Sequence, residues 1–211
     1  MPRTDERSMD RLSAGDRSRV ERAFAALRER GIEAAFAKDR AEALAWVLDR
    51  IPAGAKVAHG TSTTLLEIGF VDRMKTPGSD HRYLNPEWTK EDDPAKRALL
   101  RAKLSLEADV YLGSVQAICE TGEVIGADAT GSRQAFYVYG PPHVIWVAGI
   151  NKLVPTLADG LRRVREVALP LEDRRVRSTG GAGSHVGKLV IYEREQAGRI
   201  TLVLVGEKLG F

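Results

Sequence analysis

Apolar residues recur along this chain with two periods, and their order predicts helices that alternate with strands. The first stripe has helical spacing between residues 16 and 30 and consists of Val20, Ala23, Phe24 and Leu27. An apolar strand is expected at 32–37, and a helix at 39–50 with Asp39 as its cap. Residues 1–15 are polar and predict a flexible tail, so a single folded domain is expected over 16–211.

The alternation continues toward the end of the chain. Further strands are predicted at 56–59, 108–113 and 143–148, helices at 95–106 and 155–167, and a hairpin at 116–127. Strands alternating with helices are typical of a layered α/β sheet with right-handed crossovers. Ligands of such sheets bind at the carboxyl ends of the strands.

Three segments depart from this rhythm. Residues 71–93 lose periodicity around Pro77 and Pro86, which predicts a long surface loop. A lid over a binding site is the alternative interpretation of this segment. Residues 174–188 are basic and rich in Gly and Ser, and residues 180–184 within them favour a flexible linker. Two alternating segments, 189–192 and 200–205, then predict a C-terminal strand hairpin.

Composition narrows the class of protein. Of 211 residues, 43% are hydrophobic and 29% charged, which is typical of a soluble globular domain. The net charge of +3 is a small imbalance between 32 basic and 29 acidic residues, so we expect no nucleic-acid partner. No apolar run approaches the ~20 residues that span a bilayer, and no apolar signal core is seen, so a cytoplasmic protein without a membrane span is expected.

Cysteine and histidine usage bears on cofactors. Cys119 is the only cysteine, so the chain forms no intrachain disulfide and no thiolate cluster. The four histidines are scattered without metal-ligand spacing. We therefore expect neither an intrinsic cofactor nor a metal site. The oligomeric state stays open, a homo-oligomer included.

The most informative stretch, residues 56–69, reads as a buried strand, a small-residue turn at Gly60 and a helix start. Four hydroxyl residues crowd that start: Thr61, Ser62, Thr63 and Thr64. Free backbone N–H groups beside hydroxyls suit a carboxylate or phosphate, so these residues are candidate substrate ligands. The alternative is a capping box formed by Thr64 and Glu67.

Three other segments leave a strand and enter a small-residue turn, so they are expected to converge on the same sheet edge. The candidates are Ser114, then Asp128, Thr130, Gly131 and Arg133, and then Asn151 and Lys152. Asp128 suits a general base and Arg133 a planar fork for a carboxylate or phosphate; helix capping and solvation are the alternatives. Asn151 and Lys152 either hold a substrate oxygen or cap the next helix.

Glu120 stands beside the predicted turn at 121–122. A buried carboxylate there would serve as base or nucleophile, whereas an exposed one would be an ordinary hairpin residue. Glu120 and Asp128 are therefore the two candidate catalytic residues.

Several separated motifs, in order, resemble the LUD domain family of lactate utilization proteins. They are residues 60–69 (GTSTTLLEIG), 108–118 (ADVYLGSVQAI), 120–122 (ETG), 147–152 (VAGINK) and the closing 198–211. The resemblance implies a three-layer α/β fold similar to the ribose-phosphate isomerase, glucosamine-phosphate deaminase and CoA-transferase group. It also implies a role in oxidising lactate to pyruvate beside partner subunits that carry iron–sulfur clusters.

The chain departs from that family in one region. Many stand-alone relatives carry a cysteine-rich segment after the last long helix, where this chain has Arg177-Ser178-Thr179-Gly180-Gly181. The expected function is a subunit in oxidation of L-lactate or a related small 2-hydroxy acid, with iron–sulfur chemistry supplied only by a partner. Two alternatives stay open: a stand-alone isomerase, lyase or acyl/CoA transferase acting on a small anionic metabolite, and a non-enzymatic metabolite sensor or assembly factor.

Overall fold

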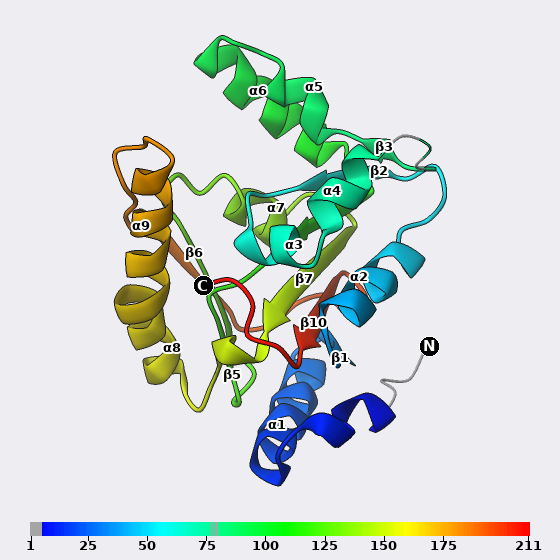
Figure 1. The fold of residues 1–211 in the computed structure, drawn as a ribbon, viewed down its shortest axis with the longest axis vertical. Coiled ribbons are helices and arrows are strands. Elements are labelled where there is room, and N and C mark those ends of the chain that lie inside the picture. The colour runs from blue at the N-terminus through cyan, green and yellow to red at the C-terminus, as the bar shows by residue number, and fades with distance from the viewer. Residues whose placement is uncertain (1–5, 77, 79) are drawn as a thin grey trace.

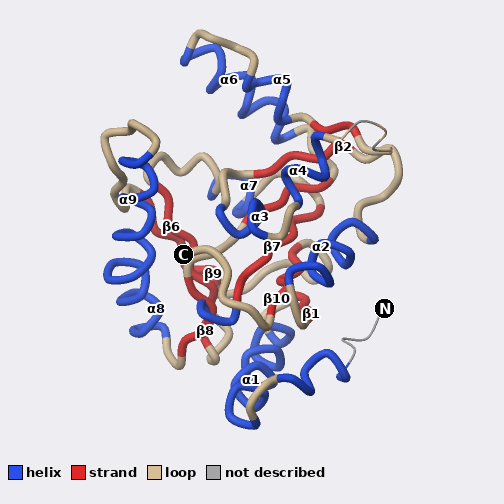
Figure 2. The backbone as a smooth tube through the Cα atoms, viewed as in Figure 1, coloured by secondary structure: helices blue, strands red, loops and turns tan. Residues whose placement is uncertain are grey.

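The computed structural model of the chain describes residues 6–76, 78 and 80–211. Within these residues the chain forms a six-stranded sheet and a four-stranded sheet, with helices packed around both (Figure 1, Figure 2). All neighbouring strands of the six-stranded sheet are parallel. In spatial order they are β1 (Glu33–Ala37), β10 (Ile200–Val205), β7 (His143–Gly149), β4 (Val110–Gly113), β2 (Lys56–His59) and β3 (Arg82–Tyr83).

The two faces of the large sheet are buried against different elements. Successive strand residues point to opposite faces, so Val203 packs with Val47 of α2 (Arg40–Asp49), whereas Leu202 packs with Phe24 of α1 (Ala14–Glu29). The face that carries Val203 is also covered by α3 (Thr63–Glu67) and α4 (Phe70–Lys75). The opposite face packs on α1, α7 (Gln134–Val138) and the second sheet.

The four-stranded sheet has the order β8 (Leu153–Val154), β5 (Ala117–Cys119), β6 (Val124–Asp128) and β9 (Lys188–Tyr192). β5 and β6 are antiparallel and joined by a tight turn, as the hairpin pattern indicated. The outer face of this sheet is covered by α8 (Leu157–Arg163) and the π-helical turn η3 (Val164–Ala168), which continue as one helical segment into α9 (Leu169–Ser178). The predicted layered α/β fold is thereby confirmed.

The predicted C-terminal hairpin is wrong. β9 pairs antiparallel with β6 in the small sheet, and β10 inserts between β1 and β7 in the large one. Each strand buries its apolar side chains in a different core, with Tyr192 packing against Trp146 and Val205 lying in the cluster around α2. The two strands therefore do not pair with each other, because their apolar side chains are buried in separate cores.

Residues 71–93 are more regular than their composition suggested. Apart from Pro77 and Ser79, which lie outside the described residues, the segment contains the end of α4, the short β3 and α5 (Asn85–Thr89). Leu84 and Trp88 are buried in the core, so this part is anchored rather than a free excursion. Beyond it, α6 (Pro94–Leu106) begins at Asp93, whose carboxylate accepts hydrogen bonds from the N–H groups of Ala95 and Lys96.

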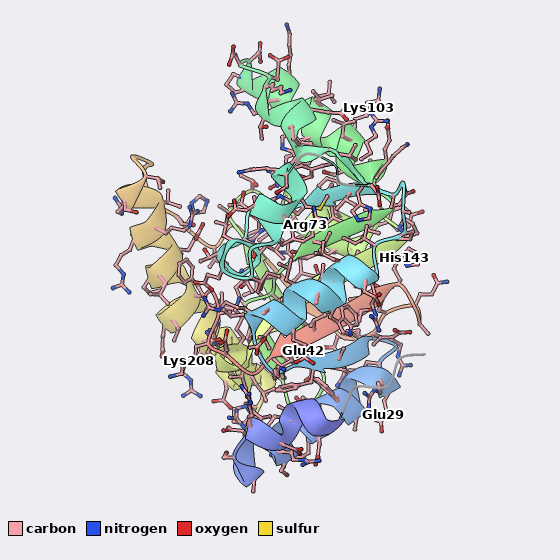
Figure 3. The ribbon with its side chains drawn as sticks, turned by 45° about the vertical axis from the view of Figure 1, so that its right-hand side comes forward. Glu29, Glu42, Arg73, Lys103, His143 and Lys208 are labelled. Atoms are coloured by element: carbon pink, nitrogen blue, oxygen red, sulfur yellow. The ribbon has the colours of Figure 1, made fainter. Side chains whose placement is uncertain are left out.

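The polar N-terminal segment and the basic segment 174–188 both contain helix that the sequence did not predict. Residues 1–5 of the predicted tail lie outside the described residues, but a 3₁₀ helix, η1 (Glu6–Arg11), follows and buries Met9. The basic segment 174–188 begins as the last turns of α9 and reaches the small sheet at Lys188, and the predicted linker at 180–184 lies between these two elements. Charged side chains such as Glu29 and Lys103 stand on the outer surfaces of their helices (Figure 3).

Candidate functional site

A cavity of about 130 Å³ lies where the carboxyl ends of β2 and β4, the turn η2 (Ile150–Lys152) after β7, and the end of β6 meet the α8–η3–α9 wall. This is the sheet edge at which parallel α/β folds bind ligands. Eight of the residues singled out from the sequence line it: Thr61, Ser62, Thr63, Thr64, Ser114, Asp128, Arg133 and Lys152. The volume suits a small metabolite, since drug-sized ligands occupy ~300–1,000 Å³.

Lys152 is the most unusual of these residues because its side chain is buried, with 2% of the residue exposed. Its Nζ donates hydrogen bonds to Ser114 Oγ at 2.9 Å and to Thr64 Oγ1 at 3.1 Å. The two hydroxyl oxygens are themselves 3.2 Å apart. Among the described residues no carboxylate lies within ion-pair distance of Nζ, although a buried ammonium ordinarily requires one.

The surroundings of Lys152 favour its neutral form. Burial is the main cause, and the positive charges of Arg163 and Arg133 add to it; together they lower the pKa of Lys152 to about 7, with Glu67 acting weakly in the other direction. Arg163 is itself buried, and its guanidinium donates to the carbonyl oxygens of Asn151 and Gln116. The amine at the end of Lys152 therefore exchanges a proton near neutral pH.

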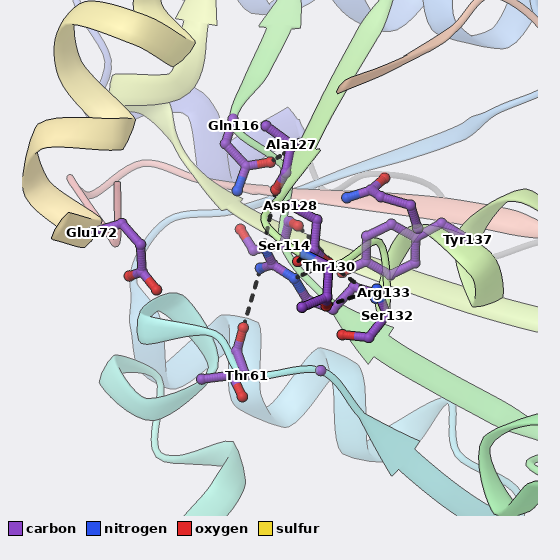
Figure 4. A network of polar contacts seen from close by, with 12 residues as sticks. Thr61, Ser114, Gln116, Ala127, Asp128, Thr130, Ser132, Arg133, Tyr137 and Glu172 are labelled. Atoms are coloured by element: carbon purple, nitrogen blue, oxygen red, sulfur yellow. Dashed lines mark hydrogen bonds and ion pairs between the residues drawn. The ribbon is translucent and has the colours of Figure 1, made fainter. Parts of the chain in front are cut away.

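Arg133 and Asp128 form the second polar feature of the cavity (Figure 4). Asp128 Oδ2 accepts from the backbone N–H of Arg133 at 3.0 Å and from its Nε at 3.2 Å. Burial opposes ionisation of Asp128, but Arg133 outweighs it and holds the pKa of that carboxyl below its ordinary value. Asp128 is thus an ionised partner of Arg133, and its role as a general base stays a prediction.

The guanidinium of Arg133 is fixed by the backbone on both sides of the cavity. Nη1 donates to the carbonyl oxygen of Thr61 at 3.1 Å and Nη2 to that of Ala127 at 3.0 Å. Each terminal nitrogen carries a second N–H, so the guanidinium can still donate two hydrogen bonds to an anion. Gly60 makes this placement feasible, because a Cβ there would overlap the Arg133 side chain. The role of Gly60 is close approach, whereas Gly131 in the turn after β6 has the left-handed conformation, with φ +87°.

The hydroxyl residues at the start of α3 have different roles, and the residue that caps the helix is Ser62 and not Thr64. Ser62 is the N-cap of α3, its Oγ accepting from the N–H of Leu65 at 3.2 Å. Thr64 instead turns inward to Lys152, and Glu67 accepts from the N–H of Gly210 at 2.7 Å. The alternative that Thr64 and Glu67 form a capping box is therefore wrong, since the helix starts at Thr63 and its cap lies two residues before Thr64.

Asn151 and Glu67 hold the C-terminal segment over Lys152 and do not line the cavity. Asn151 Oδ1 accepts from the N–H of Leu209 at 3.0 Å, and its Nδ2 donates to the carbonyl oxygen of Gly210 at 3.3 Å. Gly210 has φ +57°, and a Cβ on it would overlap Thr64 Oγ1 and stand 3.2 Å from Lys152 Nζ. Phe211 then completes the cavity lining.

One wall of the cavity was not anticipated from the sequence. It comes from the helical segment that contains the π-helical turn, a feature frequent at functional sites. The wall residues are Val164, Ala168, Leu169, Glu172 and Arg175, followed by Ser184, His185 and Val186 of the returning loop. Val164, Ala168, Glu172 and Arg175 share helical spacing, which is the signal that would have found them; the helix predicted at 155–167 ended before three of these four residues.

The remaining candidates lie outside the cavity. Glu120 forms ion pairs with Arg19 and Arg22 of α1, each at 2.6 Å, so its carboxylate joins the small sheet to α1. Thr130 Oγ1 accepts from the N–H of Ser132 in the turn after β6. Cys119 is buried, and burial first, then Glu123, raises the pKa of its thiol to about 12.

The described residues contain no group of three or more His, Cys, Asp or Glu side chains arranged to hold a metal ion. The single buried thiol of Cys119 does not match the thiolate donor set of an iron–sulfur cluster. None of the helices described is both long and apolar enough to traverse a bilayer.

Comparison with known proteins settles the family. The family model of the LUD domain matches residues 20–205. The chain belongs to the LUD domain family. The resemblance read from the separated motifs is thereby confirmed, and the LUD domain associates the chain with lactate utilization.

A solved structure agrees with this assignment. The LUD domain described here is similar to the crystal structure of a DUF162 family protein from Deinococcus radiodurans, with a TM-score of 0.56 over 92% of this chain and 99% of that chain. The two sequences are 14% identical, so the likeness concerns the fold alone. No curated protein sequence matches the chain.

Proposed function

We propose that this LUD domain binds a small 2-hydroxy or 2-oxo carboxylic acid and acts as a subunit in the oxidation of L-lactate or a related acid. The supporting observation is the placement of the Lys152 amine and the Arg133 guanidinium on one cavity of about 130 Å³. A guanidinium fork suits a carboxylate, and the amine with its two hydroxyl neighbours suits the oxygen on the adjacent carbon. The size and polarity of the cavity thus favour a short acid.

The redox centre of this function is assigned to a partner. Lactate oxidation removes two electrons, and iron–sulfur chemistry would come from a separate subunit because the single cysteine of this chain is a buried thiol. The contribution of the LUD domain is to bind the acid, orient its C2 oxygen toward Lys152, and exchange a proton there.

Calorimetric titration of the purified chain with L-lactate and with pyruvate tests this proposal. We expect binding of both, and weaker binding by Arg133→Lys, which keeps the charge and loses the fork. Arg82→Lys is the matched control, since Arg82 is exposed and pairs with Glu87 on the surface. Absence of binding for both acids would overturn the proposal. Sustained lactate oxidation by the isolated chain would overturn the subunit role.

The titrating Lys152 amine also favours a second candidate, a stand-alone isomerase or lyase for a small anionic metabolite. A group with pKa near the working pH is suited to proton transfer. This candidate predicts turnover by the isolated chain that Lys152→Met abolishes. A substrate screen that gives binding without turnover would instead favour the subunit role.

A further inference from the structure

The environment of Lys152 differs from that of a lysine that only attracts an anion. An ammonium that recruits carboxylates is normally solvated or paired, whereas Lys152 is 2% exposed and its Nζ touches two neutral hydroxyl oxygens. The two charges that act on it most strongly, Arg163 and Arg133, are positive, and Glu67 opposes them less. A buried amine among cations is the arrangement that activates lysine as a nucleophile.

The geometry points to a second chemistry at this cavity: Lys152 Nζ forms a reversible imine with the carbonyl carbon of a small 2-oxo acid. We infer that Arg133 binds the carboxylate while C2 faces Nζ. The inference rests on the proposed function for the class of ligand, and adds a covalent step that binding of L-lactate does not require. L-lactate has no carbonyl at C2 and cannot form the imine.

The step balances without any oxidant or reductant. The Nζ lone pair bonds to C2, and the carbonyl electron pair moves to oxygen, which takes a proton to give a carbinolamine. The C–O bond then breaks, and the two hydrogens of the neutral amine leave with the carbonyl oxygen as one water molecule. The product is a C=N bond between C2 and Nζ.

Two side chains are placed to move the protons of this step. Ser114 Oγ and Thr64 Oγ1 lie 2.9 and 3.1 Å from Nζ and 3.2 Å from each other, so a proton leaving the amine passes through hydroxyls already in hydrogen-bond contact. A hydroxyl both donates and accepts, which suits relay in either direction. The close cover by Gly210 limits the space around Nζ to a small reactant.

Other lysines of the chain provide an internal reference. A lysine with the ordinary pKa of 10.5 is neutral to a far smaller extent at pH 7 than Lys152, by a factor of about 1,000, because each pKa unit is tenfold in that fraction. Lys103 on the outer surface of α6 provides the comparison within the chain, because it is exposed and does not line the cavity (Figure 3). Preferential modification of Lys152 over Lys103 is therefore expected.

The test is reductive trapping of the intact chain with sodium pyruvate and sodium cyanoborohydride near neutral pH, followed by peptide mass spectrometry. We expect one adduct per chain on Lys152, with the added mass of pyruvic acid less one oxygen atom. The adduct should disappear in Lys152→Met, persist in Lys103→Met, and diminish when excess L-lactate competes. Calorimetry with L-lactate and pyruvate is run on the same samples.

The two measurements separate the proposals. Binding of L-lactate and pyruvate with no adduct on Lys152, or with labelling spread equally over surface lysines, would overturn the imine and leave the proposed function standing. An adduct on Lys152 without L-lactate binding would support the imine and overturn lactate as the ligand. If Lys152→Met does not fold, protection of the wild-type Lys152 by L-lactate decides the specificity of the adduct.

Discussion

The Nζ of Lys152 lies 2.9 Å from Ser114 Oγ, although the two residues are 38 positions apart and come from the ends of different strands. This hydrogen bond joins the carboxyl end of β4 to the turn after β7. Because the acceptor is neutral, it solvates the amine in either protonation state without supplying a counter-charge. The protonation state of Lys152 therefore depends on a hydrogen bond to a neutral hydroxyl and not on an ion pair.

Removing the Ser114 hydroxyl should lower the pKa of Lys152 further below its value of about 7, because the ammonium loses an acceptor that partly replaces water. The variant is Ser114→Ala, measured by NMR titration of ¹³C-labelled lysine. Ser105→Ala is the control: Ser105 is also buried, and its hydroxyl has no hydrogen-bond partner in the described part of the chain. An unchanged or raised pKa in Ser114→Ala would contradict the prediction.

The pH dependence of stability should report the same amine. Below about pH 7 Lys152 is protonated in both states, so its burial penalty is constant; between about pH 7 and about 10.5 the unfolded chain keeps a proton that the folded chain has lost. Stability of the wild type relative to Lys152→Met should therefore rise with pH, by up to ~1.4 kcal/mol per pH unit. Urea unfolding of both proteins measures it. Parallel stability curves across this window would refute the depressed pKa.

How much of this site the sequence reveals depends on whether a feature is local. The strand-to-turn patterns placed Ser114, Arg133 and Lys152 at strand ends, because an apolar run and the small-residue turn after it consist of consecutive residues. Burial of Lys152 depends on partners far away in the chain, which no spacing encodes. The sequence therefore indicated a ligand for a substrate oxygen or a helix cap at Lys152, where the structure has a buried amine bound to two hydroxyls.

The same distinction explains the misplaced elements. Residues 189–192 and 200–205 each have a strand pattern, but period-2 alternation does not say which strand is the neighbour, and each pairs within a different sheet. Glu120 shows the limit for single residues. The sequence around Glu120 does not show whether this carboxylate is exposed or buried, because its partners, Arg19 and Arg22 of α1, lie far away in the chain.

Glu120 should therefore matter for stability and not for ligand binding. Its side chain is 11% exposed and pairs with two arginines, so Glu120→Gln should cost about 1–3 kcal/mol. Burial opposes ionisation, but Arg19 and Arg22 outweigh it and lower the pKa of Glu120, so its contribution is present above the unfolded value of 4.5 and is lost as pH falls below it. Urea unfolding at neutral and acidic pH checks this. A loss of L-lactate binding in the folded variant would contradict the structural role.

Gly210 provides the sharpest test of how the C-terminal segment shapes the cavity. Gly210→Ala adds a Cβ where φ is +57°, and that atom overlaps Thr64 Oγ1, the hydroxyl that accepts from Lys152. Gly54→Ala is the matched control, because Gly54 has φ +76° and open space around its Cβ position.

The two glycine variants share the conformational penalty, about 1 kcal/mol, so their difference isolates the overlap. We expect Gly210→Ala to be destabilised more than Gly54→Ala in urea unfolding, and to bind pyruvate more weakly by calorimetry, because Thr64 must move away from Nζ. Gly54→Ala should bind pyruvate as the wild type does. Equal losses of stability and equal affinities in the two variants would show that the C-terminal segment does not set the position of Thr64.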